Sequence, residues 1–155
     1  MAGSIEGRLA ELGIALPEAP APAANYVPFV VSGTLVFVSG QIPVWEGELR
    51  YTGRVGDDLS VDTGYQAART CGLNLLAQAR AACDGDLNRV RRVVKLGGFV
   101  ACAPDFTDHP QVINGASDLM VEVFGDVGRH ARFAVGAPAL PLGVAVEVDG
   151  VFEIA

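Results

Sequence analysis

The sequence predicts an α+β domain in which one β-sheet carries two helices on one of its faces. Strand-like and helical segments alternate along the chain, and this alternation favours a single two-layer unit. A length of 155 residues fits one domain. A hydrophobic content of 50% provides a core and leaves apolar surface to be buried between subunits.

Four segments have the β-branched and aromatic residues that are typical of strands. In the first of them, Ser32-Gly33 supplies a turn, so this segment is expected to form two short strands. A further weak strand is expected within the loop-like residues 45–56. The four strand segments are 29–43, 92–102, 131–141 and 143–154.

Two longer segments have small and apolar side chains at helical spacing, which predicts helices over 64–83 and 111–125. The many alanines of the first allow it to pack closely on a sheet. Asp62 or Thr63 is expected to cap the first helix, and Asp108 the second.

Residues 1–24 are expected to be an appendage to the main domain, which occupies 25–155. Ile5, Leu9 and Leu12 share one face of a short helix, and the prolines that follow predict an extended connector. Because so short a helix is marginal alone, we expect it to dock on the rest of the chain.

Composition excludes several classes of partner and cofactor. The net charge of −7 argues against nucleic acid, and no apolar run approaches the roughly 18 residues of a membrane helix. Three widely spaced cysteines are interpreted as buried free thiols, and no spacing typical of metal ligands is recognised in the sequence. The sequence also has no recognisable catalytic Cys–His pair, Ser–His–Asp triad or nucleotide-binding glycine motif. We expect no metal, no cofactor and, without a recognisable signal peptide, a cytoplasmic location.

Two charged residues stand inside apolar strand segments near the C-terminus. Arg132 is either an exposed strand residue or a planar fork that grips a carboxylate or phosphate. Glu147 is either solvent-facing or a group that orients water and accepts a proton. If the two strands pair, both residues can rim one pocket. His130 is interpreted as a partly buried strand residue, and Tyr26 as an anchor for the connector.

Six segments stand in the order and spacing of a known family: "YVPFV", "VSGQIP", "AARTCGLNLLAQ", "VVKLGGFVA", "VINGASDLMVEVFG" and "ARFAVGAPALPLGVAVEV". Over about residues 25–154 the chain resembles the RidA/YjgF/UK114 family, also labelled L-PSP endoribonuclease. The resemblance implies a fold like the small trimeric (bacillus-type) chorismate mutase, with a mostly antiparallel sheet. It also implies a homotrimer around a central barrel, with ligand sites in the clefts between subunits.

The activity that the resemblance implies is hydrolysis of reactive 2-imino acids, or their enamines, to 2-keto acids and ammonia. Arg132 is then expected to bind the substrate carboxylate and Glu147 to hold the hydrolytic water. Ala134 stands where many deaminase members have a cysteine, so only its backbone groups are available. The remaining substrate-binding residues implied are Tyr26, Gln41 and, with one residue inserted before the last strands, Asn114.

The N-terminal segment, the insertion at 43–59 and Ala134 depart from the standard pattern and indicate a divergent branch. A non-catalytic protein that senses small carboxylates therefore stays as an alternative. A ribonuclease is the third hypothesis, and the acidic charge argues against it.

Overall fold

A five-stranded sheet in the order β1-β2-β7-β5-β6 forms one layer of the protein, in a computed structural model that describes residues 4–22 and 24–155. Neighbouring strands are antiparallel except β5 and β6, which are parallel. The predicted α+β fold with a mostly antiparallel sheet is confirmed. The strands are β1 (Phe29–Ser32), β2 (Leu35–Gln41), β5 (Val90–Ala101), β6 (Ala131–Ala137) and β7 (Val146–Ile154), and a separate hairpin joins β3 (Val44–Trp45) and β4 (Glu48–Leu49).

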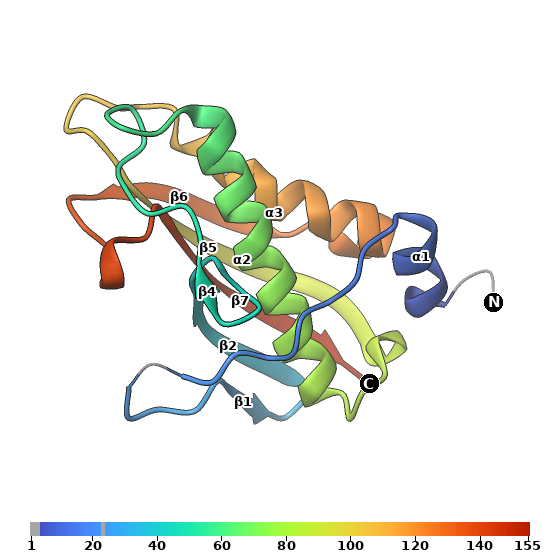
Figure 1. Cartoon of the computed structure of the whole chain (residues 1–155). Coiled ribbons are helices and arrows are strands. Elements are labelled where there is room, and N and C mark those ends of the chain that lie inside the picture. Colours follow the sequence, from blue (N-terminus) through green and yellow to red (C-terminus); the bar gives the residue numbers. More distant parts are fainter. Residues whose placement is uncertain (1–3, 23) are drawn as a thin grey trace.

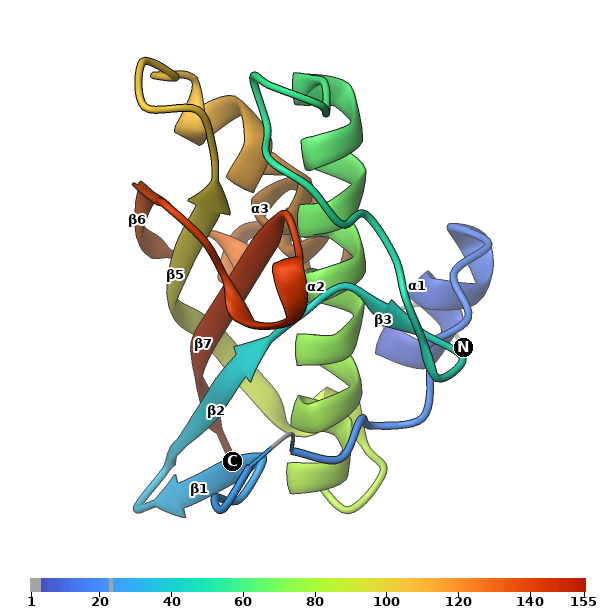
Figure 2. The same cartoon turned by 60° about the vertical axis from the view of Figure 1, so that its left-hand side comes forward.

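Two long helices, α2 (Val61–Ala82) and α3 (His109–Phe124), pack against each other on one face of the sheet (Figure 1). Figure 2 shows the layers from the side, with β2, β7 and β5 on one side and α2 on the other. The helices approach closely, because a Cβ atom on Gly115 would collide with the carbonyl oxygen of Tyr65. Among the described residues, no helix is long and apolar enough to cross a membrane.

The helix caps differ from the prediction. Ser60, rather than Asp62 or Thr63, caps α2: its Oγ accepts a hydrogen bond from the Thr63 backbone N–H at 3.1 Å. The helix therefore begins at residue 61, earlier than the apolar spacing indicates. Asp108 does hold the N-cap position of α3, but its side chain makes no capping hydrogen bond.

The short helix α1 (Ile5–Glu11) docks beside α3 (Figure 1). Its Leu9 side chain is buried in the core. The Arg8 Nε atom donates to the carbonyl oxygen of Glu122 at 2.8 Å, and the Ile5 backbone N–H donates to Asn88 Oδ1 at the same distance. The appendage is thus held by apolar packing, to which Ile5 and Leu12 also contribute, and by polar contacts.

Two buried amides on α2 hold the connector and the β3–β4 hairpin. Asn74 Nδ2 donates to the carbonyl oxygens of Ile42 and Val44 at 3.0 and 2.9 Å. One turn later, Gln78 Nε2 donates to the carbonyl oxygen of Pro20 at 2.7 Å. Because residues four apart share one helix face, both segments are held over the same side of α2.

Candidate functional site

Arg132 lies on β6, and its side chain reaches α3. Its Nη1 atom donates to Asn114 Oδ1 at 2.8 Å and to Ser117 Oγ at 3.1 Å. Asn114 and Ser117 are three residues apart on α3, so both side chains face the same strand. Ala134 follows Arg132 at a spacing of two on β6 and therefore points to the same face of the sheet.

A hydrogen-bonded chain behind Arg132 fixes the orientation of Ser117. His130 Nδ1 lies 2.6 Å from the carbonyl oxygen of Gly128, which can only accept, so Nδ1 carries the proton. His130 Nε2 then accepts from Ser117 Oγ at 2.8 Å, which turns the serine lone pairs toward Arg132. Burial lowers the pKa of His130, which keeps the imidazole neutral in this role.

The charge of Arg132 is not neutralised by any carboxylate of the described residues. Both of its hydrogen bonds go to uncharged oxygens, and no ion pair among those residues includes it. The side chain is half-buried, and its Nε and Nη2 atoms make no hydrogen bond within the described part of the chain. A fixed guanidinium with donors to spare can accept an anion in two parallel hydrogen bonds.

Glu147 lies on β7 and packs against β2. A Cβ atom on Gly40 would collide with the Glu147 carboxylate, so only glycine leaves room for it there. Burial raises the pKa of Glu147 above its ordinary value, and the charge of Asp149 raises it further. A carboxylate whose pKa is raised is a stronger base once it is ionised.

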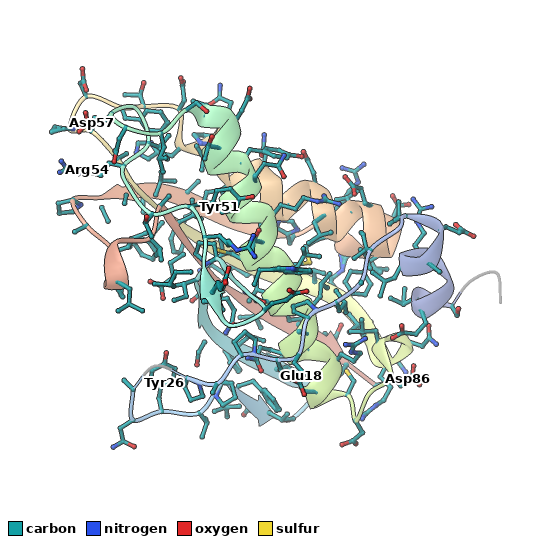
Figure 3. The ribbon with its side chains drawn as sticks, in the orientation of Figure 1. Glu18, Tyr26, Tyr51, Arg54, Asp57 and Asp86 are labelled. Carbon is teal, nitrogen blue, oxygen red and sulfur yellow. The ribbon has the colours of Figure 1, made fainter. Side chains whose placement is uncertain are left out.

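Gln41 and Tyr26 line the same cavity as Glu147. Gln41 is buried at the end of β2, where its Nε2 donates to the carbonyl oxygen of Ser39 at 2.9 Å. Tyr26 is 47% exposed, in the loop before β1 (Figure 3). Ser39 ties this loop to β2, because its Oγ donates to the carbonyl oxygen of Val27 at 2.8 Å. Both side chains are thus placed by β2.

A cavity of 980 Å³ opens beside Glu147. The connector that Gln78 holds and the hairpin that Asn74 holds form most of its wall, so the two segments that depart from the standard family pattern shape it. Its wall is mostly apolar and includes Trp45, prolines and alanines. The lining comprises residues 15–22, 24, 26, 28, 40–42, 44–47, 49, 74, 141, 142 and 147.

The structure separates the two charged residues within one chain. The strands β6 and β7 do not pair, because β5 lies between them. Arg132 pairs in register with Leu96, which is buried under the helices, whereas Glu147 pairs with Phe99, which is exposed on the opposite face. One chain therefore presents the arginine and the glutamate on opposite faces of the sheet. Because the two strands do not pair, the two residues do not rim one pocket within a single chain.

Three residues that contribute to sites in the structure, Ser117, Cys102 and His109, were not predicted to do so from the sequence. Ser117 positions Arg132, and its only sequence signal is the spacing of three from Asn114. His130, interpreted from the sequence as a partly buried strand residue, lies just before β6 and orients Ser117. Cys102 and His109 form a Cys–His contact at 3.5 Å. The sequence does not predict this contact, because a turn brings the two residues together. Within the described residues, no group of three or more His, Cys, Asp or Glu side chains is arranged to hold a metal ion.

A family model described as "YjgF/chorismate mutase-like, putative endoribonuclease" matches residues 6–153. The chain belongs to this family. It is 52% identical to protein TCP17 of Trypanosoma cruzi over 153 residues, which cover 98% of this chain and 95% of that protein. The YjgF-like fold predicted from the resemblance is thus confirmed, and the family match includes the connector.

Two solved structures show how far this YjgF-like fold extends. A Shewanella oneidensis protein with the same endoribonuclease description is 38% identical, covers 98% of this chain and 100% of its own, and superposes with a TM-score of 0.94. RidA from the Antarctic bacterium Psychrobacter is 27% identical, with coverages of 88% and 94% and a TM-score of 0.60. The Shewanella oneidensis protein therefore matches this chain over almost its full length.

Proposed function

We propose that this YjgF-like protein hydrolyses 2-imino acids to 2-keto acids and ammonia, in clefts between the subunits of a homotrimer. Membership of the family supports the proposal, and so does the position of Arg132. That residue is a half-buried guanidinium, fixed by neutral partners and not neutralised by any described carboxylate. This single observation carries the proposal, because such a group is suited to the carboxylate that every 2-imino acid has.

The chemistry asks little of the protein. An imine carbon is already electrophilic, so the site has to orient the substrate, supply water and accept a proton. In the proposed step Glu147 takes a proton from water while the water oxygen attacks the imine carbon, and the electron pair of the C=N bond moves to nitrogen. Glu147 returns this proton to the nitrogen, which gives a neutral carbinolamine. The hydroxyl proton of the carbinolamine then passes to nitrogen through Glu147 as the C–N bond breaks with its electron pair, and ammonia and the 2-keto acid are released.

The placement of the two residues supports clefts between subunits. Arg132 and Glu147 face opposite sides of one sheet, so both can contact one small substrate only if they come from different copies of the chain. We therefore assign Arg132, Asn114 and Ala134 to one wall of each cleft. Tyr26, Gln41 and Glu147 belong to the wall that the neighbouring copy supplies.

Binding without turnover is the second candidate, and Ala134 favours it because the cysteine of many deaminase members is absent there. Under this alternative Arg132 still grips a carboxylate, but freshly prepared 2-iminopropanoate disappears no faster with the protein than without it. A ribonuclease has less support, since the net charge is −7 and a polyanion is repelled.

Calorimetric titration with 2-oxobutanoate tests the arginine. We expect Arg132→Lys to weaken binding by about thirty-fold, because an ammonium cannot make the planar two-bond contact and about 2 kcal/mol is lost. Arg129→Lys is the matched control, since Arg129 is an exposed arginine three residues earlier, and it should bind as the wild type does. Equal affinities for the wild type and Arg132→Lys would refute the proposed site.

A further inference from the structure

A second pocket, of 340 Å³, lies where β5 ends and α3 begins, and it shares no lining residue with the cavity beside Glu147. Cys102 and His109 both line it, with the sulfur 3.5 Å from the imidazole Nε2. In the tautomer that carries its proton on Nδ1, Nε2 accepts a hydrogen bond from the thiol. A thiol and a base within hydrogen-bonding reach, at the wall of a pocket, form the core of a nucleophilic site.

The surrounding backbone keeps this pair together. Phe106 closes the turn between the two residues, with its backbone N–H donating to the carbonyl oxygen of Ala103 at 3.0 Å, and its ring packs edge-on against His109. On β6, Gly136 packs closely against the pair: a Cβ atom there would lie 2.7 Å from His109 Nε2 and 2.9 Å from Cys102 Sγ, so a larger residue would push them apart. A small molecule would instead reach the sulfur from the pocket that Cys102 and His109 line.

Arg54 adds a positive charge to the same pocket. The chain at Val55 pairs with the end of β5, because the Ala103 backbone N–H donates to the Val55 carbonyl oxygen at 3.0 Å, and this places Arg54 in the lining. Its one ion pair among the described residues, with Asp57, is long at 4.0 Å and exposed. Arg54 lies near the beginning of α2, well away from Tyr26 (Figure 3).

The other two thiols differ from Cys102 in their surroundings. All three cysteines are buried, and burial raises the pKa of the Cys71 and Cys83 thiols above the ordinary value. Neither lines the pocket, and neither has a histidine partner among the described contacts. They serve as internal standards for the reactivity of Cys102.

We propose that Cys102 and His109 form a second reactive site, whose thiol attacks small carbon electrophiles that carry a carboxylate. In this step the Cys102 sulfur forms a bond to the electrophilic carbon, and the bond from that carbon to its leaving group breaks with its electron pair. The thiol proton passes to His109 Nε2, and Arg54 attracts the carboxylate. The site uses neither Arg132 nor Glu147, so the result of its test does not depend on whether the imine reaction occurs.

Alkylation of the intact protein near neutral pH tests the thiol, with iodoacetamide as the uncharged probe and iodoacetate as the anionic one. Iodide is the leaving group in both cases, and the labelled peptides are quantified by mass spectrometry. We expect Cys102 to react at least about tenfold faster than Cys83 or Cys71, and His109→Gln to slow both probes about tenfold. If Cys102 reacts no faster than Cys83, or if His109→Gln reacts at the wild-type rate, the proposal is wrong.

Two more variants keep the test decisive. Gly136→Ala places a methyl group against Nε2 and the sulfur, so it should slow Cys102 labelling even if His109→Gln does not fold, and an unchanged rate would overturn the site. Arg54→Gln should slow iodoacetate about threefold and leave iodoacetamide unchanged, because only the anion senses the charge. Arg50→Gln, a change at an equally exposed arginine, is the control. Equal effects of Arg54→Gln on the two probes would exclude the anionic class of electrophile.

Discussion

Arg132 and Glu147 illustrate two ways in which a charge is kept available for a ligand. The arginine is held only by the neutral oxygens of Asn114 and Ser117, with His130 fixing the serine behind it. The glutamate is half-buried in a gap that Gly40 leaves, where burial works against its charge. In the isolated chain, neither charge is fully stabilised by its surroundings. Incompletely stabilised charges are a common feature of functional sites.

Replacing Glu147 by glutamine is expected to stabilise the protein while it removes turnover. Folding raises the pKa of Glu147, so the stability linked to its protonation is present below the unfolded pKa and is lost as pH rises through the folded pKa. Near neutral pH the ionised carboxylate therefore opposes folding, and Glu147→Gln should raise Tm by about 2 °C.

Calorimetric melting curves measured from neutral pH down to about pH 4 follow this effect. The advantage of Glu147→Gln should shrink as pH falls, since the wild-type carboxyl then becomes protonated. Glu153→Gln, the same change on the same face of β7, is the control. A lower Tm for Glu147→Gln at neutral pH would show that the carboxylate is structural.

At the scale of elements, local sequence patterns predicted the strands and helices whose formation depends on residues close together in the chain. Runs of β-branched residues located the strands, and apolar spacing located α2 and α3. The start of α2 was missed because Ser60 precedes the apolar pattern. The insertion of β5 between β6 and β7 is a long-range pairing, so the opposite facing of Arg132 and Glu147 was beyond sequence patterns. The Cys102–His109 contact depends on the course of a turn and was missed for the same reason.

The close approach of α2 and α3 at Gly115 gives a prediction at this scale. Gly115→Ala forces the helices apart, because the new methyl group meets the carbonyl oxygen of Tyr65. The free energy of unfolding in urea should fall by about 2 kcal/mol. Gln111→Ala, at an exposed position of the same helix, should change it by less than about 0.5 kcal/mol. Equal midpoints for the two variants would contradict the packing.

At the scale of the whole molecule, the sheet face opposite the helices carries a group of exposed apolar side chains. Val30, Phe37, Phe99 and Val135 project from it in register and are 51%, 46%, 38% and 43% exposed in the single chain. Monomeric proteins seldom leave such large side chains together in water. The face therefore suits contact with further copies of the chain.

Light scattering at micromolar concentration is expected to give a mass of about three times 16.1 kDa. Phe99→Asp should dissociate the trimer, because it places a charge in the apolar contact. Val127→Asp should leave it intact, since Val127 is also 38% exposed but lies beside α3. A stable monomer mass for the wild type, or identical masses for the two variants, would contradict this arrangement.

Mixing two inactive variants tests most directly whether each site joins Arg132 of one copy to Glu147 of another. Arg132→Ala and Glu147→Ala are refolded separately and together, and the loss of 2-iminopropanoate is followed. Random assembly of trimers gives about one quarter of the sites both intact residues when they come from different copies, so the mixture should regain about a quarter of the wild-type rate. A mixture no more active than either variant alone, with wild-type activity present, would place both residues in one chain and contradict the account.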